Sequence, residues 1–429
     1  MSYRNRRSVA VLGVPFDNVT MHEAMDLIEE KIEEQGFHQV ATANVDFIVN
    51  AIHDQSLQEM LCSCDLVVPD GMPIVWASRL MGSKLKERVS GVDLIPRLAE
   101  LASKRRYGIY LLGASERSSR RASEVLKKRF PKLRIVGRHC PPVSPLAEMD
   151  HDTILRRIER AQPDILLVAM GHPKQEQWLS MHRHRLKVPL CMGVGASLDF
   201  LAGEVSRAPL WMQTAGLEWL YRAAHEPRRL TQRYLVDAYG LARHLPLQMA
   251  ANAIQPRKVT STLQTYQQDN ASIISIHGNF KGSLLGELEG QLERAYKEDH
   301  HIVLDLAQTA YFGLDSVGLL VHLAKVMKRR KRELWLAAMP PHGIRVLRAA
   351  RMSHYFVSTS SVSDALYRIK KAESQLFTGG ILVQTFTHNS PDIHVQVELL
   401  KDLCRRIVYL SQSARVATGQ AHTRSSATR

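Results

Sequence analysis

The sequence has 429 residues, a length that favours two or three domains rather than one. Its composition, 45% hydrophobic and 23% charged, is that of a globular protein with apolar cores. The net charge of +15 favours an anionic partner: nucleic acid, a phosphorylated substrate or an acidic lipid. A merely basic surface is an equal alternative on charge alone.

Several classes of protein are excluded by what the sequence lacks. The five cysteines form no CxxC pair or paired zinc spacing, and a disulfide framework is not expected at this length, which fits a reduced cytosol. The basic start has no apolar core of a signal peptide. No stretch reaches the ~20 apolar residues that span a bilayer, and the closest, 188–203, contains Asp199. We therefore expect a soluble or peripheral protein.

Residues 8–202 alternate short apolar runs with amphipathic segments. Strands are predicted at 9–14, 109–114, 164–171 and 189–195, and helices at 22–35, 93–104 and 117–129. This alternation is typical of a Rossmann-like α/β fold, a parallel sheet with helices on both faces. Ligands of such sheets bind at the carboxyl ends of the strands, where this sequence carries Gly113, Gly171 and Gly195.

The rest of the chain divides into a helical appendage and a second, smaller α/β unit. Residues 204–258 predict two or three helices rich in Arg, Trp and Tyr. The second unit has strands at 271–278, 301–306 and 334–339 and helices at 282–297, 315–330 and 343–352, and one more strand and helix are expected before a disordered tail. The predicted boundaries are a core at 1–203, an appendage at 204–255, a linker at 256–270, a small α/β domain at 271–374 and an end segment at 375–429.

Familiar catalytic signatures are absent from the sequence. No GxGxxG follows the first strand, and P-loop, zinc-hydrolase and serine-nucleophile patterns are also missing. GVGAS, which contains Gly193 and Gly195, is Gly-rich, but a lone GxG is weak evidence. The chemistry must therefore reside in polar residues that follow apolar runs.

Two such groups follow the first half's strands. Thr42 and Asn44 stand two residues apart, so on a strand they face the same way and can hold a polar ligand, or they can form a local turn. Asp70 follows 66–69 in a Pro-Asp-Gly sequence, where a carboxylate can act as a general base, although PDG is also an ordinary turn. Downstream, KERVSGVDL offers Arg88 and Asp93.

Two further groups lie later in the chain. Lys174, Gln175 and Glu176 begin a helix after Gly171 and suit a phosphate or a base, or they cap the helix. Residues 204–258 have eight Lys/Arg against four Asp/Glu, with aromatic residues interleaved, which suits a diphosphate or a membrane interface. Nucleic acid is disfavoured, because no recognition helix or base-stacking signature accompanies the charge.

The order of these motifs resembles a known family. T-x-N, PDG, ERV-x-G-x-D, G-x-PKQE-x-W, GVGAS-x-DF-x-AG, RAP-x-W and LEWLYR-x-x-x-EPRRL-x-x-RY follow one another over roughly residues 8–245. The sequence is similar to the WecG/TagA/CpsF family, glycosyltransferase family 26. The resemblance implies transfer of N-acetylmannosamine, its uronic acid or another hexose from a UDP-sugar to an undecaprenyl-diphosphate-linked saccharide, with inversion and without a metal or cofactor. The product would be a cell-envelope or exported polysaccharide.

The resemblance also implies roles for individual residues. Asp70 would be the catalytic base, Thr42 and Asn44 acceptor- and sugar-side groups, and Arg88 and Gln175 further active-site residues. Arg222 and Arg228 would close over the site and neutralise the leaving diphosphate. The remaining substrate-binding candidates are Gly171, Lys174, Glu176, Gly193, Gly195, Asp199, Arg207, Glu218, Trp219 and Arg229.

Residues 271–368 resemble a STAS domain, the fold of anti-sigma-factor antagonists. Asp315, Ser316 and Gly318 stand where those proteins have a DSxG turn that opens a helix, whose serine is phosphorylated in the switching members. A phosphate adds ~1.5–2 negative charges, which would disturb a docked partner. The resemblance thus implies a protein partner or a kinase, while many STAS domains are unphosphorylated docking modules.

Two hypotheses from different classes follow. The first is a membrane-peripheral transferase at the inner face of the cell membrane; the second is a non-catalytic transferase-like scaffold in STAS-mediated signalling. Retention of Asp70, Arg88 and the arginines favours the enzyme. The donor sugar, the acceptor, the STAS partner and the oligomeric state, a homo-oligomer included, are left open.

Overall fold

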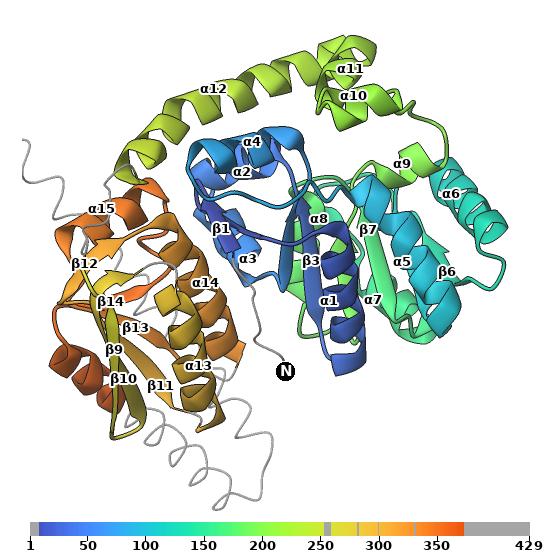
Figure 1. Ribbon diagram of the computed structural model, residues 1–429. Coiled ribbons are helices and arrows are strands. Elements are labelled where there is room, and N and C mark those ends of the chain that lie inside the picture. Colours follow the sequence, from blue (N-terminus) through green and yellow to red (C-terminus); the bar gives the residue numbers. More distant parts are fainter. Residues whose placement is uncertain (1–7, 253–258, 281–282, 299, 330–331, 373–429) are drawn as a thin grey trace, which may run out of the picture. The chain divides into compact units, whose positions relative to one another are not determined.

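Figure 1 gives the fold as a computed structural model, which describes residues 8–252, 259–280, 283–298, 300–329 and 332–372. The chain divides into two units, Met1–Ala365 and Leu366–Arg429. Every element named below belongs to the first unit. Of the second unit, residues 366–372 are described and are helical. The strand and helix predicted after residue 374, and the predicted disordered tail, lie outside the described residues.

The centre of the first half is a six-stranded sheet of order β4-β3-β8-β7-β5-β6, in which every neighbouring pair is parallel. Its strands are β3 (His38–Ala43), β4 (Leu66–Pro69), β5 (Gly108–Gly113), β6 (Arg134–His139), β7 (Ile165–Ala169) and β8 (Leu190–Gly193). The connecting helices are α1 (Met21–Glu34), α2 (Val45–His53), α3 (Gln55–Ser63), α4 (Met72–Leu80), α5 (Gly91–Arg105), α6 (Glu116–Arg129), α7 (His151–Ala161) and α8 (Lys174–His182), with a 3₁₀ turn at Leu146–Glu148.

Both faces of this sheet are buried by helices, as the sequence predicts. Along β5, Ile109 and Leu111 pack with α1, α5 and α6, whereas Tyr110 and Leu112 pack with α7 and α8. Successive side chains of a strand point to opposite faces, so two apolar layers explain why these strands read as continuous apolar runs. In Figure 1, α1 and α5 lie on one face of the sheet, and α7 lies on the other. The predicted α/β fold is confirmed.

The beginning of the chain differs from the prediction. The single strand expected at 9–14 is a hairpin of β1 (Ser8–Val11) and β2 (Val14–Asp17), which forms a separate two-stranded antiparallel sheet. Leu12 and Gly13 both have positive φ, 47° and 94°, the backbone of a tight hairpin turn. The apolar run concealed the turn, because only Gly13 marks it in the sequence. The hairpin is tied to the large sheet by Asp17, whose Oδ2 accepts from the Val67 N–H at 2.7 Å.

The helical appendage follows the last strand. Its helices are α9 (Ser197–Leu201), α10 (Leu210–Thr214), α11 (Glu218–His225) and the long α12 (Pro227–Asn252). Figure 1 shows α10 to α12 as one arc of helices along the first unit. No helix among the described residues is long and apolar enough to cross a membrane.

A second mixed sheet contains β9 (Thr262–Gln268), β10 (Ala271–Phe280), β11 (His301–Asp305), β12 (Thr309–Phe312), β13 (Leu334–Ala337) and β14 (Val357–Thr359). The strands run in the order β12-β10-β11-β13-β14, and β9 pairs antiparallel with β10. Helices α13 (Ser283–Lys297), α14 (Leu314–Arg329) and α15 (Pro341–Ala349) connect them. The linker predicted at 256–270 includes β9. Its seven residues, TLQTYQQ, are almost all exposed, so no buried face marks them as a strand in the sequence.

Candidate active site

The carboxyl ends of β3, β4 and β8 meet at one edge of the large sheet. The chain passes from β3 to β4 on one side and later returns to the other side of β3 as β8. Such a reversal of strand order leaves a crevice beyond the strand ends, which is where open α/β sheets bind ligands. Thr42 is the penultimate residue of β3 and Asn44 follows that strand, Asp70 follows β4, and the segment 194–197 follows β8. The fold thus brings together three groups that are far apart in sequence.

Asp70 occupies a turn between β4 and α4. Its backbone N–H donates to the Ala43 carbonyl at 2.9 Å, which extends the ladder between β3 and β4 by one bond. Gly71 has φ +154°, a conformation that side chains rarely adopt, and this explains the glycine in the PDG motif. The turn places the Asp70 carboxylate beside the start of α5, where Oδ2 accepts from the Gly91 N–H at 3.4 Å.

The electrostatic setting of Asp70 suits a base. Removal of the carboxylate from water raises its pKa to about 6, and the charges of Arg88 and Arg222 limit the rise. The Gly91 hydrogen bond also lowers the pKa, and Glu218 raises it further. A pKa near 6 lets the group be ionised near neutral pH while it remains a better proton acceptor than an ordinary carboxylate.

Thr42 and Asn44 lie differently although they are neighbours. Thr42 is buried, and a Cβ on Gly91 would lie 3.2 Å from both its Oγ1 and the Ser197 Oγ. Glycine at position 91 therefore allows α5 to approach β3 and the loop after β8 closely. Asn44 is the N-cap of α2, with Oδ1 accepting from the Phe47 N–H at 3.4 Å. The local-turn reading of Asn44 therefore has structural support.

Arg88 belongs to an ion network of four residues. Its guanidinium donates to Glu218 at 2.8 Å and to Asp93 at 3.4 Å. Arg207 binds Asp93 with two nitrogens, at 2.6 and 2.8 Å, and lies 3.4 Å from Glu218. Paired, partly buried charges of this kind hold a fixed geometry. The network joins α5 and the segment before it to the first residue of α11, so it sets the position of the appendage over the strand ends.

The other arginines predicted to bind substrate, Arg222, Arg228 and Arg229, differ in their surroundings. Arg222 of α11 lies 5.3 Å from the Phe200 ring centre, and its Nε is buried without a hydrogen-bond partner among the described residues. Trp219 packs edge-on against Tyr234. Arg228 is exposed at the start of α12, and the side chain of Arg229 is not described. The Nε of Arg233 also has no hydrogen-bond partner among the described residues, but that guanidinium pairs with Asp46 and Asp237.

Gln175 and Glu176 of the PKQE motif form hydrogen bonds with other residues of the protein. The buried Gln175 accepts from the Gly195 N–H at 3.0 Å and donates to Glu176 at 2.6 Å, and Glu176 also binds His172. A Cβ on Gly193 would lie 2.5 Å from the Glu176 Oε1. These contacts shape the loop after β8, so Gln175 acts on the site through that loop.

The remaining substrate-binding candidates of this region are Lys174, Gly171, Gly195 and Asp199. Lys174 donates to the Ser144 carbonyl. Gly171 and Gly195 have positive φ, 79° and 49°, and no atom lies within 4 Å of a Cβ built on either. Asp199 is half-buried, and its backbone N–H bonds Ala196. Open space at the two glycines is compatible with close approach of a ligand to the backbone.

Sequence reasoning missed several residues that shape this region. Gly91 lies against both Thr42 and Ser197, yet neither Gly91 nor Ser197 stood out, because small residues near helix starts are common. His172 stacks on Phe47 at 3.5 Å between ring centres. Asp46 pairs with Arg233 of α12 at 3.2 Å, and no local pattern joins two charges so far apart in the chain.

In the second half, Ser316 is fully buried at the start of α14. Its hydroxyl donates to the Phe280 carbonyl and accepts from the Gly313 N–H. Both roles stabilise the turn that opens the helix. The hydroxyl is not accessible to solvent in this arrangement.

Comparison with known proteins decides the family. Residues 9–254 match the model described as "Glycosyl transferase WecG/TagA/CpsF family", and residues 263–359 match "Mlab, STAS domain". The chain belongs to the WecG/TagA/CpsF family. It is therefore a glycosyltransferase, with a STAS domain behind the matched region, and both sequence resemblances are confirmed.

Relatives in this family come from Staphylococcus aureus. A protein of strain MRSA252 named "N-acetylglucosaminyldiphosphoundecaprenol N-acetyl-beta-D-mannosaminyltransferase" is 30% identical over 257 residues, covering 59% of this chain and 96% of the relative. A protein of the same name from strain MW2 is 29% identical over the same lengths. Solved structures similar to the chain include an anti-sigma factor antagonist from Mycobacterium paratuberculosis. That protein is 20% identical with a TM-score of 0.24, and the match covers 27% of this chain and 99% of the antagonist.

Proposed function

We propose that this WecG/TagA/CpsF member transfers N-acetylmannosamine, its uronic acid or another hexose from a UDP-sugar to an undecaprenyl-diphosphate-linked saccharide. The name of the S. aureus relatives supports the lipid-linked acceptor and the transfer of N-acetylmannosamine. The observation that carries the proposal is the Asp70 carboxylate, with its raised pKa, at the carboxyl edge of the sheet beside Arg88 and Arg222. No such constellation is needed for a scaffold.

The reaction needs one base and one anion-binding group. The Asp70 carboxylate takes the proton of the acceptor hydroxyl as the oxygen attacks the anomeric carbon. The bond from that carbon to the β-phosphate oxygen breaks on the opposite face, so the configuration inverts. The departing UDP gains negative charge, which the guanidinium of Arg222 stabilises through its unpaired Nε.

The arginines replace a metal ion in this scheme. Arg222 with its unpaired donor, and the exposed Arg228 nearby in sequence, supply positive charge instead. We infer that the transfer does not require a divalent cation.

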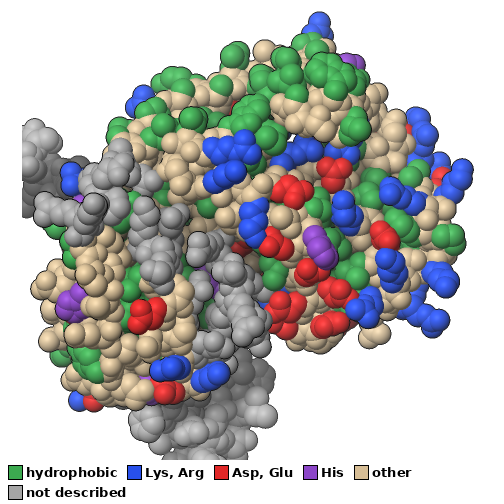
Figure 2. All heavy atoms as spheres, viewed as in Figure 1, with side chains coloured by type: hydrophobic (Ala, Val, Ile, Leu, Met, Phe, Trp, Pro, Cys, Tyr) green, Lys and Arg blue, Asp and Glu red, His purple; other side chains and the backbone are tan. Residues whose placement is uncertain are grey.

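The outer surface of the appendage supports work at a membrane surface. Large apolar side chains are exposed along α10 to α12: Leu210, Trp211, Trp219, Leu220, Leu235, Val236, Tyr239 and Leu247. Figure 2 shows hydrophobic side chains gathered over this part of the molecule. Exposed apolar groups in such number mark an interaction surface, and aromatic residues beside cations suit a bilayer interface. We propose that this surface rests on the inner face of the cell membrane, where a lipid-linked acceptor would lie.

A donor screen tests the proposed function directly. UDP release is measured with UDP-N-acetylmannosamine, its uronic acid and UDP-glucose, each with and without a lipid-diphosphate disaccharide analogue. The proposal expects release with one donor that depends on the acceptor. If no donor gives acceptor-dependent release while the donors bind, the scaffold alternative replaces the enzyme.

A further inference from the structure

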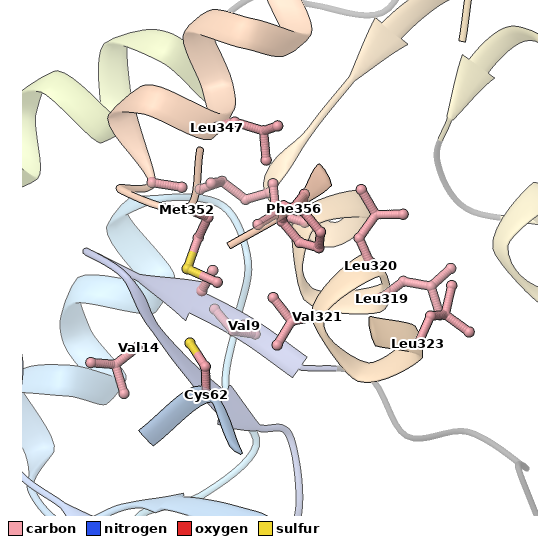
Figure 3. Close-up of a cluster of buried hydrophobic side chains, with 14 of the residues drawn as sticks. Val9, Val14, Cys62, Leu319, Leu320, Val321, Leu323, Leu347, Met352 and Phe356 are labelled. Carbon is pink, nitrogen blue, oxygen red and sulfur yellow. The ribbon is translucent and has the colours of Figure 1, made fainter. Parts of the chain in front are cut away.

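The STAS domain and the transferase half share one buried cluster. Val9 and Val14 of the hairpin and Cys62 of α3 belong to the same apolar core as Leu320 of α14 and Met352. In Figure 3, Val9 lies beside Val321 of α14, and Met352 and Cys62 border the same cluster. Domains joined by a polar contact alone tend to move relative to each other, whereas a continuous apolar core resists such motion.

Polar groups across this boundary are paired. The buried Gln58 of α3 donates to the Arg351 carbonyl at 2.7 Å and to the Gly13 carbonyl at 3.0 Å. Arg351 in turn donates to the Ile52 carbonyl at 2.6 Å, and the Tyr355 hydroxyl donates to the Cys62 carbonyl. Buried polar groups that find partners on the other domain indicate a specific contact.

The two domains approach each other closely at Gly318 of α14, in the DSxG sequence of the STAS domain. A Cβ built on Gly318 would lie 1.8 Å from the Ser8 carbonyl oxygen of β1. Glycine is thus required for α14 to meet the hairpin backbone. The hairpin of the transferase half therefore lies against α14 at the DSxG sequence, where the sequence suggested an external partner.

The same contact reaches the appendage. Gln248 of α12 is buried against the hairpin, accepting from the Leu12 N–H at 2.9 Å and donating to the Ala10 carbonyl at 2.7 Å. Further along α12, Leu241, Leu245 and Met249 pack on the shared core, and α12 contacts α15. The opposite end of this helix carries Arg228 and Arg233, and Arg233 pairs with Asp46 in the first turn of α2, the helix that follows β3.

We propose that the STAS domain is an intramolecular buttress, which binds the hairpin and α12 and thereby positions the arginine-bearing helices over the active site. Its partner is the transferase half of its own chain. The Ser316 hydroxyl is buried and bonds Phe280 and Gly313 of the STAS domain itself. The expected effect of the STAS domain on turnover rests on the proposed function. The contact between the STAS domain and the transferase half does not depend on that function.

Gly318→Ala in the full chain tests the buttress, with Gly290→Ala as the matched control. Both are glycines of STAS-domain helices, but no atom lies within 4 Å of a Cβ on Gly290. Alanine favours a helix at either position, so loosening at 318 would oppose helix propensity. Amide hydrogen exchange is followed in the hairpin 8–17 and in β10 and β11, and UDP release is followed with a soluble acceptor.

We expect Gly318→Ala to speed exchange in the hairpin on the order of tenfold, without change in β10 and β11, and to slow turnover several-fold. Gly290→Ala should leave both unchanged. Unchanged hairpin exchange in Gly318→Ala contradicts the contact, and faster exchange with unchanged turnover contradicts the buttress. If wild type turns over no donor, the exchange arm still decides the contact.

A second variant is needed in case Gly318→Ala disrupts the fold of the STAS domain itself. Should β10 and β11 also exchange faster in Gly318→Ala, Arg351→Gly takes its place, because it removes the bond to Ile52 at a position whose φ of 56° suits glycine. The same expectations apply to it. Light scattering of wild type completes the test: a monomer with a protected hairpin supports an intramolecular contact, whereas protection found only in a dimer places the STAS domain on a second copy and overturns the proposal.

Discussion

Asp70 and Ser316 are alike in sequence and opposite in structure. Asp70 lies in the turn before α4, and Ser316 lies in the first turn of α14. Asp70 keeps part of its surface accessible, and its pKa is raised to about 6 among charges that do not fully compensate its burial. Ser316 is buried, with its hydroxyl both donating and accepting within its own domain. The difference indicates that a polar side chain whose charge is incompletely compensated is a candidate for chemistry. A polar side chain whose hydrogen bonds are all made within the fold stabilises the structure instead.

Asp70→Asn is the variant that would break this comparison most severely. Loss of the base should lower turnover by ~10²–10⁴-fold and leave UDP-sugar binding nearly unchanged. Asp152→Asn, which removes an exposed ion pair with Arg185, is the control and should retain activity. Turnover of Asp70→Asn within threefold of wild type, measured by UDP release, would remove Asp70 from the mechanism.

Asp70→Asn should lower activity but raise the stability of the folded protein near neutral pH. The folded state raises the pKa of Asp70 from 3.8 to about 6, so it favours the protonated form. The stability that this group contributes is lost as pH rises from about 3.8 to about 6. An amide at position 70 escapes that loss, so Asp70→Asn should melt at a higher temperature than wild type near neutral pH and at the same temperature near pH 3. A lower melting temperature at neutral pH would refute the desolvated carboxylate.

Arg222→Ala tests whether this arginine, whose Nε has no partner, stabilises the leaving group. Removal of one preorganised donor to a developing charge typically costs ~10²–10³ in kcat. Arg222→Lys should recover part of the loss, because the charge returns without the planar guanidinium. Arg243→Ala, an exposed change on the same appendage, is the control. Equal kcat for Arg222→Ala and wild type would exclude Arg222 from stabilising the departing UDP.

The apolar surface of the appendage should show a smaller effect. Trp211→Ser combined with Leu235→Ser should weaken binding to vesicles of phosphatidylglycerol and phosphatidylcholine on the order of tenfold, because two side chains no longer enter the interface. Val143→Ser, at an exposed apolar residue outside α10 to α12, is the control. Vesicle sedimentation that is unchanged by the double variant would place the membrane contact elsewhere.

Metal removal should have the smallest effect. Because arginines are proposed to neutralise the diphosphate, dialysis against EDTA should leave turnover within about twofold of the untreated enzyme. Restoration of activity by added magnesium or manganese after a complete loss would contradict the arginine-based mechanism.

Local patterns in the sequence identified the strand ends but not the long-range pairings. The parallel sheet, the place of Asp70 and most helices follow from apolar periodicity and turn residues. The hairpin 8–17 was concealed within one apolar run, and β9 lacks an apolar face. The link from Arg88 to Glu218 joins residues 130 positions apart, and the contact of Gly318 with Ser8 joins two domains. No local pattern encodes such contacts, since they depend on how whole elements pack.

The pH profile of kcat/KM tests the role of Asp70 most directly. The base must be ionised, so kcat/KM for wild type should rise with pH through an apparent pKa near 6 and then reach a plateau. The residual activity of Asp70→Asn should lack that limb. A limb that persists unchanged in Asp70→Asn would assign the titrating base to another residue and contradict the proposed mechanism.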